Sequence, residues 1–384
     1  MSLNPPKRRV GNNMRYLYLA VIWGIVWVSS AHAVAPDYEE FRLSNGMEVV
    51  LVPNTKVPVV MHMVWYKVGA MDEPVGKSGI AHFLEHLMFK ATDSMATGEF
   101  SKRIALMGGR DNAFTGQDFT AYHQVVPKAR LADVMRMEAD RMQHLRFDEE
   151  EVLTERDVIV EERFARTDNQ PRAKLQEQMS AALFRNHPYR LPIIGWKHEI
   201  ESYTLADAKQ WYRAYYTPNN AVLVVTGDVT REELQPLAEE IYGVTPKREV
   251  RHPAIPTEPP FNAAKRVTLK DDRVQQPEWM RYYAAPSLKT GETEHAYALQ
   301  LLARILGQGS ASLLYQSLVV EQKIAASAGA FYDEMKRGPG MFGVYAIPAG
   351  EHDVKKLELA VEAVLQQVIT EGVDTTRLAK VKQS

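Results

Sequence analysis

Short runs rich in β-branched residues alternate along the chain with longer stretches of helical hydrophobic periodicity. Two strands joined by a short turn are expected at 46–53 and 57–68. Further strands are predicted at 112–115, 120–126 and 221–225. Helices are predicted at 79–90, 97–107, 128–145 and 231–242. Another helix is expected to begin after Asp148 as its N-cap and to continue past Glu162.

The second half of the chain repeats this order of elements. The elements expected there follow the same order as those between residues 79 and 145. They are helices at 295–306 and 312–322, strands at 325–332 and 340–347, and a helix at 354–369. Asp374 follows Val373 as Asp148 follows Phe147. On this register Ser384 corresponds to a position near Val158, so we expect a fragment that lacks the end of a second domain.

The first 33 residues have the layout of a secretory signal. The basic residues Lys7, Arg8, Arg9 and Arg15 precede the apolar run 16–28, and Ala31-His32-Ala33 forms a small-residue cleavage site. Cleavage after Ala33 predicts an exported chain, which in a bacterium is periplasmic. The alternative is an uncleaved anchor in the inner membrane that faces the periplasm. The apolar run is shorter than the roughly 20 residues that a span requires.

The composition and charge of the chain limit which partners and metal ligands are possible. Hydrophobic residues make up 45% and charged residues 24% of the 384 residues, which is typical of a globular protein large enough for two domains. Removal of the four basic leader residues takes the formal charge from -2 to -6, which argues against a nucleic-acid partner. Because the chain has no cysteine, any metal must be held by His, Asp or Glu.

The sequence His82-Phe83-Leu84-Glu85-His86 lies on the predicted helix 79–90. Histidines four residues apart share a helix face, and Glu85 falls on the same side, as in the inverted zinc-peptidase motif. A catalytic zinc takes a third protein ligand. Glu155 and Glu162, seven residues apart on one helix face, are both candidates for it. The competing interpretations are a chance motif, histidines hydrogen-bonded in the core, and an ordinary solvated acidic face.

Several separated motifs in one order make residues 38–384 resemble the pitrilysin/insulinase family of inverted-motif zinc peptidases. The resemblance is closest to the short bacterial members similar to mitochondrial processing peptidase. It rests on Gly79–Phe89, Gly108-Gly109, Asn112–Thr115 with Asp118, Thr120 and Tyr122, Glu155–Val158 with Glu161-Glu162, His187-Pro188-Tyr189, Tyr215-Tyr216, Asn219–Ala221 and Gly227-Asp228.

The resemblance implies an α+β fold of two related α/β-sandwich domains, like those of mitochondrial processing peptidase. Their sheets would be mostly antiparallel, with helices packed on them. We therefore expect a signal peptide at 1–33, a zinc-binding catalytic domain at 34–245 and a linker at 246–262. A second, metal-free domain would follow at 263–384, incomplete at its C-terminus. The proline-rich stretch 245–260 independently favours a linker there.

The resemblance also implies the roles of the site residues. Glu162 would be the third ligand beside His82 and His86 for one Zn²⁺ per chain, and Glu155 would support the site. Glu85 would activate the attacking water. Asn112, Ala113 and Phe114 would form an edge strand to which substrate adds by backbone pairing. The implied activity is a zinc-dependent endopeptidase acting on extended peptides or small unfolded proteins.

One segment departs from the family pattern. Where complete members carry an Arg and, seven residues on, a Tyr that grip the substrate, this chain has Val319 and Ala326. We therefore expect the zinc-bearing subunit of a heterodimer whose homologous partner supplies that pair. The alternative is a non-catalytic peptide-binding or assembly protein, although the presence of Glu85 favours the enzyme. A serine hydrolase lacks support because no Gly-x-Ser-x-Gly motif occurs.

Overall fold

Alternating apolar residues of the first half build one sheet in the computed structural model, which describes residues 37–350 and 353–383. We call residues 37–243 the first lobe. Its sheet has the order β1-β2-β6-β3-β5-β4, and all neighbours are antiparallel except β2 and β6. The strands are β1 (Glu39–Arg42), β2 (Glu48–Pro53), β3 (Val59–Tyr66), β4 (Arg110–Thr115), β5 (Thr120–Pro127) and β6 (Ala221–Gly227).

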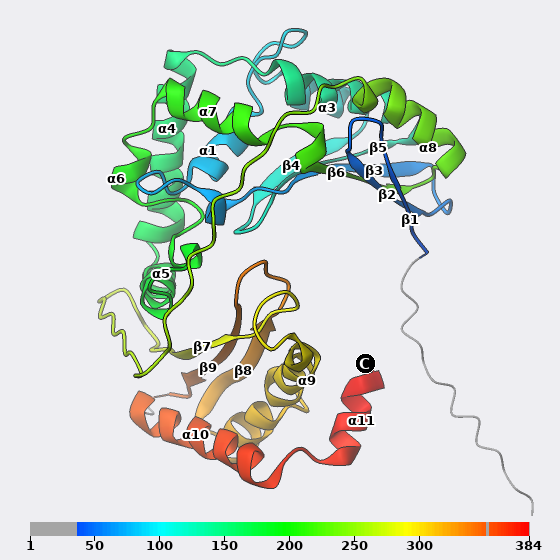
Figure 1. Cartoon of the computed structure of the whole chain (residues 1–384). Helices are drawn as coiled ribbons and strands as arrows, with labels where there is room; N and C mark the ends of the chain where they lie inside the picture. Colours follow the sequence, from blue (N-terminus) through cyan, green and yellow to red (C-terminus); the bar gives the residue numbers. More distant parts are fainter. Residues whose placement is uncertain (1–36, 351–352, 384) are drawn as a thin grey trace, which may run out of the picture. The chain divides into compact units, whose positions relative to one another are not determined.

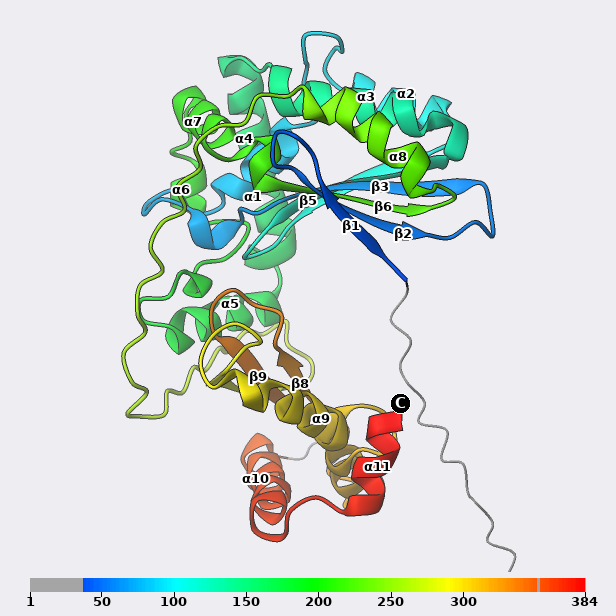
Figure 2. The ribbon, with the colours of Figure 1, turned by 45° about the vertical axis from the view of Figure 1, so that its right-hand side comes forward.

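Helices α2, α3 and α8 lie together on one face of this sheet (Figure 2). Val60 and Val64 of β3 are fully buried, whereas Met61 and Met63 on the opposite face are only half-buried. The α-helices of the first lobe are α1 (Ile80–Leu87), α2 (Glu99–Leu106), α3 (Leu131–His144), α4 (Glu149–Arg163), α5 (Pro171–Leu183), α6 (Lys197–Ile200), α7 (Leu205–Tyr215) and α8 (Arg231–Ala238).

The predicted elements of the first lobe are found, with local differences. The predicted helix 128–145 starts with a 3₁₀ turn, η2 (Lys128–Arg130), and the predicted helix 231–242 ends in a π-helical turn, η6 (Glu239–Gly243). Strand β1 and helices α5, α6 and α7 were not predicted. Helix α5 has no buried residue, so it carries no apolar face for a periodicity argument to detect.

The second lobe, 279–383, repeats the central part of the first. Its three-stranded sheet has the order β7-β9-β8, which matches β3-β5-β4 of the first lobe, and helices α9 and α10 pack against it. The predicted helix 312–322 is instead π-helical over η8. The elements are β7 (Trp279–Ala285), α9 (Ala296–Gly307), η8 (Tyr315–Glu321), β8 (Ala325–Asp333), β9 (Gly340–Pro348), α10 (Val354–Glu371) and α11 (Thr375–Gln383).

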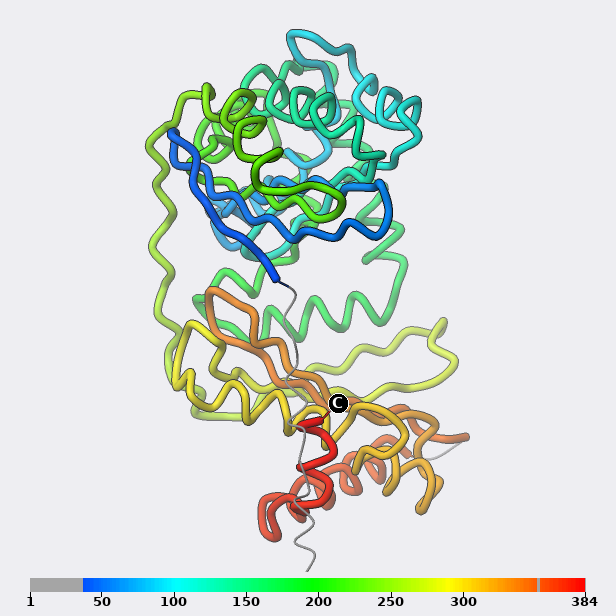
Figure 3. The backbone as a smooth tube through the Cα atoms, turned by 90° about the vertical axis from the view of Figure 1, so that its right-hand side faces the viewer, coloured from blue at the N-terminus to red at the C-terminus, as the bar shows by residue number. Residues whose placement is uncertain are grey.

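The segment 244–278 connects the lobes without a helix or a strand (Figures 1 and 3). Each lobe has its own apolar core, and residues Pro36–Ser384 form one compact unit. The α+β fold with mostly antiparallel sheets is confirmed, whereas the bounds of the four predicted segments stay predictions. The predicted signal peptide lies outside the described residues. Among the described residues, no helix is both long and apolar enough to cross a membrane.

Candidate metal centre

Helix α1 carries the His-x-x-Glu-His motif, and its start is fixed by backbone geometry. Gly79 precedes the helix with φ +91°, and a Cβ at this position would lie 2.5 Å from the carbonyl oxygen of Ile194. The buried carboxylate of Glu73 accepts hydrogen bonds from the backbone N–H groups of Gly79 (2.8 Å) and Ala81 (3.0 Å). The first turn is therefore held at its N-terminus.

Helix α4 brings Glu162 to the two histidines of α1. Its start is set by Asp148, the predicted N-cap, whose side chain accepts the N–H of Glu151, and the two residues form a capping box. His82 Nε2 lies 3.8 Å from Glu162 Oε1, and His86 Nε2 lies 3.3 Å from Glu162 Oε2. One ligand atom from each of these three residues lies within 4.8 Å of the others, so the structure places the three predicted ligands together.

Glu155 contacts His86 at the ring nitrogen that does not face Glu162. Its Oε1 lies 2.8 Å from His86 Nδ1, which leaves Nε2 of that ring facing Glu162. Its Oε2 lies 2.6 Å from Lys90 Nζ, and both side chains are largely buried. Lys90 and Glu155 thus fix the orientation of the His86 ring.

Glu85 shares helix α1 with the histidines but makes a different contact. The hydroxyl of Thr115, at the end of β4, donates a hydrogen bond to Glu85 Oε2 at 2.5 Å. Burial raises the pKa of the Glu85 carboxyl, although this hydrogen bond opposes the shift. A raised pKa makes a carboxylate a stronger proton acceptor.

The pKa values of the two histidines are shifted in opposite directions. Burial and the nearby charge of His86 lower the pKa of His82 to about 4. Burial also disfavours charge on His86, but its hydrogen bonds to Glu155 and Glu162 raise its pKa to about 9. The hydrogen bond from His86 holds the pKa of each glutamate low. At neutral pH the pocket therefore holds one neutral imidazole and one protonated imidazole between two carboxylates.

The donor set fits zinc. Two imidazoles and one carboxylate form a three-ligand group that zinc accepts with one coordination position left open. The Nδ1 of His86 pairs with Glu155, so its Nε2, which faces Glu162, is the nitrogen that would bind the ion once it loses its proton. His82 Nδ1 is buried with no hydrogen-bond partner among the described residues. These residues would hold the ion, and Glu85 and Thr115 would remain free for other roles.

The predicted substrate strand is an edge strand. Strand β4 lies at the end of the six-stranded sheet, so one of its backbone edges is unpaired by the strands described. Asn112 and Phe114 are exposed on it, and Ala113 packs against the first core. Phe114 contacts Trp65 edge to face at a centroid distance of 5.3 Å. This strand ends at Thr115, whose hydroxyl contacts Glu85.

Three residues near the site were not singled out from the sequence. Lys90 binds Glu155, Thr115 binds Glu85, and Arg166 Nη1 lies 2.5 Å from Glu162 Oε1 with its side chain 73% exposed. Lys90 and Arg166 follow His86 and Glu162 by four residues, so helical spacing could have indicated both. Thr115 ends the motif Asn112–Thr115, but no local pattern in the sequence indicates its contact with Glu85.

The two positions that depart from the family pattern lie in the second lobe. Val319 is in η8 and packs partly buried against the second core, and Ala326 is exposed at the start of β8. Neither side chain has a polar group. The structure therefore places no hydrogen-bonding side chain at these two positions.

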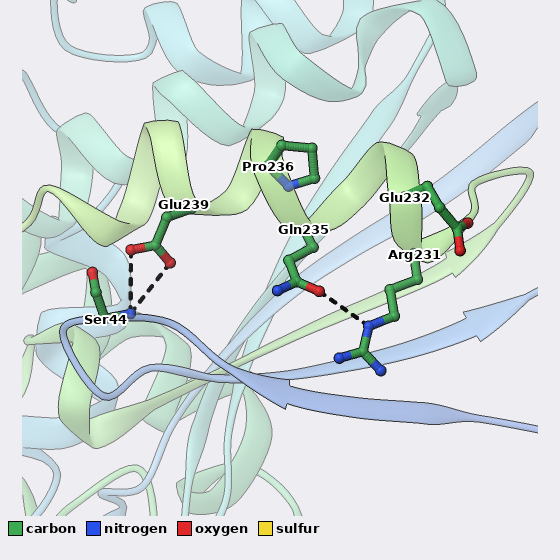
Figure 4. Close-up of a pocket in the computed structure, with 6 residues that line it drawn as sticks. All are labelled: Ser44, Arg231, Glu232, Gln235, Pro236 and Glu239. Carbon is green, nitrogen blue, oxygen red and sulfur yellow. Dashed lines mark hydrogen bonds between the residues drawn. The ribbon is translucent and has the colours of Figure 1, made fainter.

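A surface depression lies elsewhere, along helix α8 (Figure 4). Its polar groups pair with one another. The backbone N–H of Ser44 donates to both carboxylate oxygens of Glu239 at 3.2 Å, and Arg231 Nε donates to Gln235 Oε1 at 3.0 Å. None of the three potential metal ligands His82, His86 and Glu162 lines it, and we assign it no role.

Comparison with known proteins connects this geometry to one family. Residues 48–197 match the family described as "Insulinase (Peptidase family M16)", and residues 202–384 match "Peptidase M16 inactive domain". The zinc protease PqqE of Helicobacter pylori is 36% identical over 322 residues, which cover 82% of this chain and 71% of that protein. An uncharacterized zinc protease of Mycobacterium tuberculosis is 31% identical, covering 89% and 77%.

Solved structures agree with this assignment. A protease from Helicobacter pylori matches with a TM-score of 0.82 at 33% identity, covering 90% of this chain and 83% of that one. A peptidase M16 inactive domain from Pseudomonas fluorescens has the same fold, with a TM-score of 0.77 at 16% identity, covering 90% and 82%. The relatives named zinc proteases support a peptidase function. The predicted family is thus confirmed, and this chain belongs to the insulinase family of peptidases, M16.

Proposed function

We propose that this chain is a zinc-dependent endopeptidase that holds one zinc ion with His82, His86 and Glu162. The observation that carries the proposal is the group of three ligand atoms within 4.8 Å, with the buried carboxyl of Glu85 on the same helix as both histidines. Such a group leaves a coordination position open, as catalytic zinc sites do.

Glu85 is the proposed general base and acid. Zinc, when bound, supplies Lewis-acid polarisation and lowers the pKa of water. Glu85 takes a proton from the attacking water and delivers it to the leaving amine. Its burial raises its pKa, which suits both steps, and the hydroxyl of Thr115 holds the carboxyl in place at 2.5 Å.

The proposed substrates are extended peptides or small unfolded proteins. A peptide that pairs with the free edge of β4 lies along Asn112, Ala113 and Phe114. Backbone pairing accepts many sequences, so selection falls to side-chain contacts such as those of the exposed Phe114. Most strands of a folded protein are already paired on both edges, so unfolded segments fit this contact best.

We further propose that a homologous partner subunit completes the enzyme. Val319 and Ala326 cannot donate side-chain hydrogen bonds. The family resemblance implies an Arg and a Tyr at these positions, which would grip the substrate. The proposal predicts weak activity of the purified chain alone and full activity with its partner. Full activity of the full-length chain alone would reject it.

The predicted leader supports a periplasmic location. The basic and apolar order of residues 1–33 is that of a secretory signal. N-terminal sequencing of the mature protein from a bacterial host should start at Val34. Retention of the leader in the membrane fraction would instead support the inner-membrane anchor.

A non-catalytic peptide-binding protein is the second candidate, and one experiment separates it from the peptidase. Wild-type protein should contain about one zinc per chain and cleave an unstructured peptide, and a chelator should stop cleavage. Glu85→Gln should retain zinc and lower kcat by about 10²–10⁴-fold, the usual contribution of a general base. Glu161→Gln, on the exposed side of the same α4 turn as Glu162, is the matched control and should stay active. Cleavage by Glu85→Gln at the wild-type rate would contradict the proposed mechanism.

A further inference from the structure

The loop between β8 and β9 of the second lobe contacts the first lobe through its backbone. The N–H of Arg337 donates to Asp118 Oδ2 at 3.1 Å, and the N–H of Gly338 donates to the hydroxyl of Tyr189 at 3.0 Å. That hydroxyl in turn donates to Asp118 Oδ1 at 2.6 Å. Both oxygens of the buried Asp118 carboxylate are therefore used in holding this loop.

The side chain of Arg337 makes a second contact. Its Nη1 lies 2.9 Å and 3.2 Å from the two carboxylate oxygens of Asp72, whose side chain has no solvent exposure. Asp72 also accepts the N–H of Gly69, and His252 Nδ1 lies 3.0 Å from its Oδ1. A buried carboxylate is costly without partners, so removal of Arg337 leaves a partly uncompensated charge.

Both contacts converge on the turn between β4 and β5. Asp118 belongs to that turn, and Asp72 belongs to the short helix η1 (Ala70–Asp72), which is bonded to it. The N–H of Ala70 donates to the carbonyl of Gly116 at 3.1 Å, and the N–H of Met71 donates to that of Gln117 at 2.9 Å. The loop of the second lobe thus holds the turn directly and through η1.

The same turn follows the residue that holds the proposed base. Thr115 ends β4, donates to Glu85, and comes directly before Gly116. A displacement of the turn by a fraction of an ångström changes the 2.5 Å contact between Thr115 and Glu85. It also changes the course of the edge strand that would pair with substrate.

We propose that loop 334–339 is a positioning clamp, through which the second lobe fixes the β4–β5 hairpin and thereby Thr115, Glu85 and the substrate edge. The effect on turnover rests on the proposed peptidase function. The clamp itself rests only on the contacts of Arg337, Gly338, Asp118 and Asp72. The second lobe, whose described residues hold no group of three potential metal ligands, acts on the centre through this loop.

Gly338→Ala tests the clamp by a change in the loop itself. A Cβ at this position would clash with the ring of the buried His187, which accepts a hydrogen bond from the N–H of Tyr189 at its Nδ1. The loop or the His187 ring must therefore shift, and either shift disturbs the contact between Gly338 and Tyr189. Met335→Ala is the matched control because Met335 lies in the same loop with 77% of its surface exposed. Arg337→Ala is a second, independent release of the loop.

Hydrogen exchange and kinetics on full-length, zinc-loaded protein provide the readouts. Gly338→Ala and Arg337→Ala should speed amide exchange in residues 110–122 several-fold and lower kcat/KM by about tenfold or more. Zinc affinity and the exchange of α3 should stay at wild-type values, which a general loss of folding would not allow. Met335→Ala should match wild type in all readouts.

Unchanged exchange in residues 110–122 for both release variants would overturn the clamp. Faster exchange with unchanged kcat/KM would also overturn it, because the hairpin would then not position the site. If the wild-type protein cleaves no peptide, the proposed function fails. The exchange experiment then still decides whether the loop holds the hairpin.

Discussion

The two lobes share one arrangement of elements and differ in what their corresponding helices carry. Helix α1 of the first lobe holds two histidines and a glutamate, with His82 and Glu85 each 8% exposed. Helix α9 buries only apolar side chains in the second lobe, among them Ile305 and Leu306. Within residues 37–350 and 353–383, the one group of three potential metal ligands belongs to the first lobe.

Packing also differs between the two lobes. A Cβ at Gly307 would lie 1.7 Å from the backbone nitrogen of Ala330, so α9 ends in direct contact with the backbone of β8. Polar side chains buried in a core cost stability unless they find partners. The first lobe meets this cost with partners such as Glu155 and Thr115, whereas the second lobe uses the same fold for packing. The following changes test that contrast through zinc affinity.

Removal of a ligand should have the largest effect. His82→Ala leaves two ligands, and the zinc content should fall from about one per chain to none. His198→Ala, with its side chain exposed on α6, is the matched control and should bind zinc normally. Metal analysis after dialysis measures both. Full zinc content in His82→Ala would place the metal elsewhere and remove the contrast between the lobes.

A change of pH should have the next largest effect on zinc affinity. The pKa of His86 is raised from 6.5 to about 9, so without metal the ring is protonated at neutral pH and stabilises the folded state. That contribution is complete below about pH 6.5 and is lost as pH rises through 9. Zinc must displace this proton, so its affinity should rise about tenfold per pH unit below 9.

Calorimetry in two buffers of different ionisation enthalpy measures the proton released on zinc binding. About one proton should be released near pH 7.5, all of it from His86, because the pKa of His82 is lowered to about 4. Zinc affinity that is flat between pH 6 and 8 would contradict the protonated His86.

Loss of the ion pair between Lys90 and Glu155, which orients His86, should have a smaller effect on zinc affinity. Lys90→Met frees the Glu155 carboxylate, and the His86 ring loses its fixed orientation. Zinc affinity should fall about tenfold, as is typical when a residue behind a ligand is changed. Lys90→Arg should restore part of it. Lys102→Met, exposed on α2, is the control, and an equal loss there would show a general effect of charge.

A cavity in the second lobe should leave zinc affinity unchanged. Leu357 on α10 is buried in the second core, and Leu357→Ala should cost about 2–5 kcal/mol in the free energy of unfolding. Denaturant unfolding measures the stability, and competition with a chelator measures zinc binding. A loss of zinc affinity as large as that of Lys90→Met would show that the metal centre depends on the second core.

Local patterns in the sequence predicted most helices and strands, including α1 and α4, which carry the metal centre. The capping box at Asp148 and the spacing of His82 and His86 depend on neighbours a few residues away. The choice of Glu162 over Glu155 came from the family resemblance, because both lie on one face of α4. Spacing alone does not decide which of them meets the histidines.

Contacts between distant segments could not be predicted in this way. The bond between Thr115 and Glu85 joins β4 to α1, and the bond between Arg337 and Asp72 joins the two lobes. Such pairs depend on how the layers pack rather than on any local pattern. Helix α5 was missed for a related reason, because it buries no residue and shows no apolar face.

The X-ray absorption spectrum of the zinc-loaded protein at the zinc edge tests the central claim most directly. The account predicts two imidazole nitrogens at about 2.0–2.1 Å and a carboxylate oxygen at about 2.0–2.2 Å, from His82, His86 and Glu162. A spectrum with fewer than two imidazoles, or one that Glu162→Gln leaves unchanged, would contradict it.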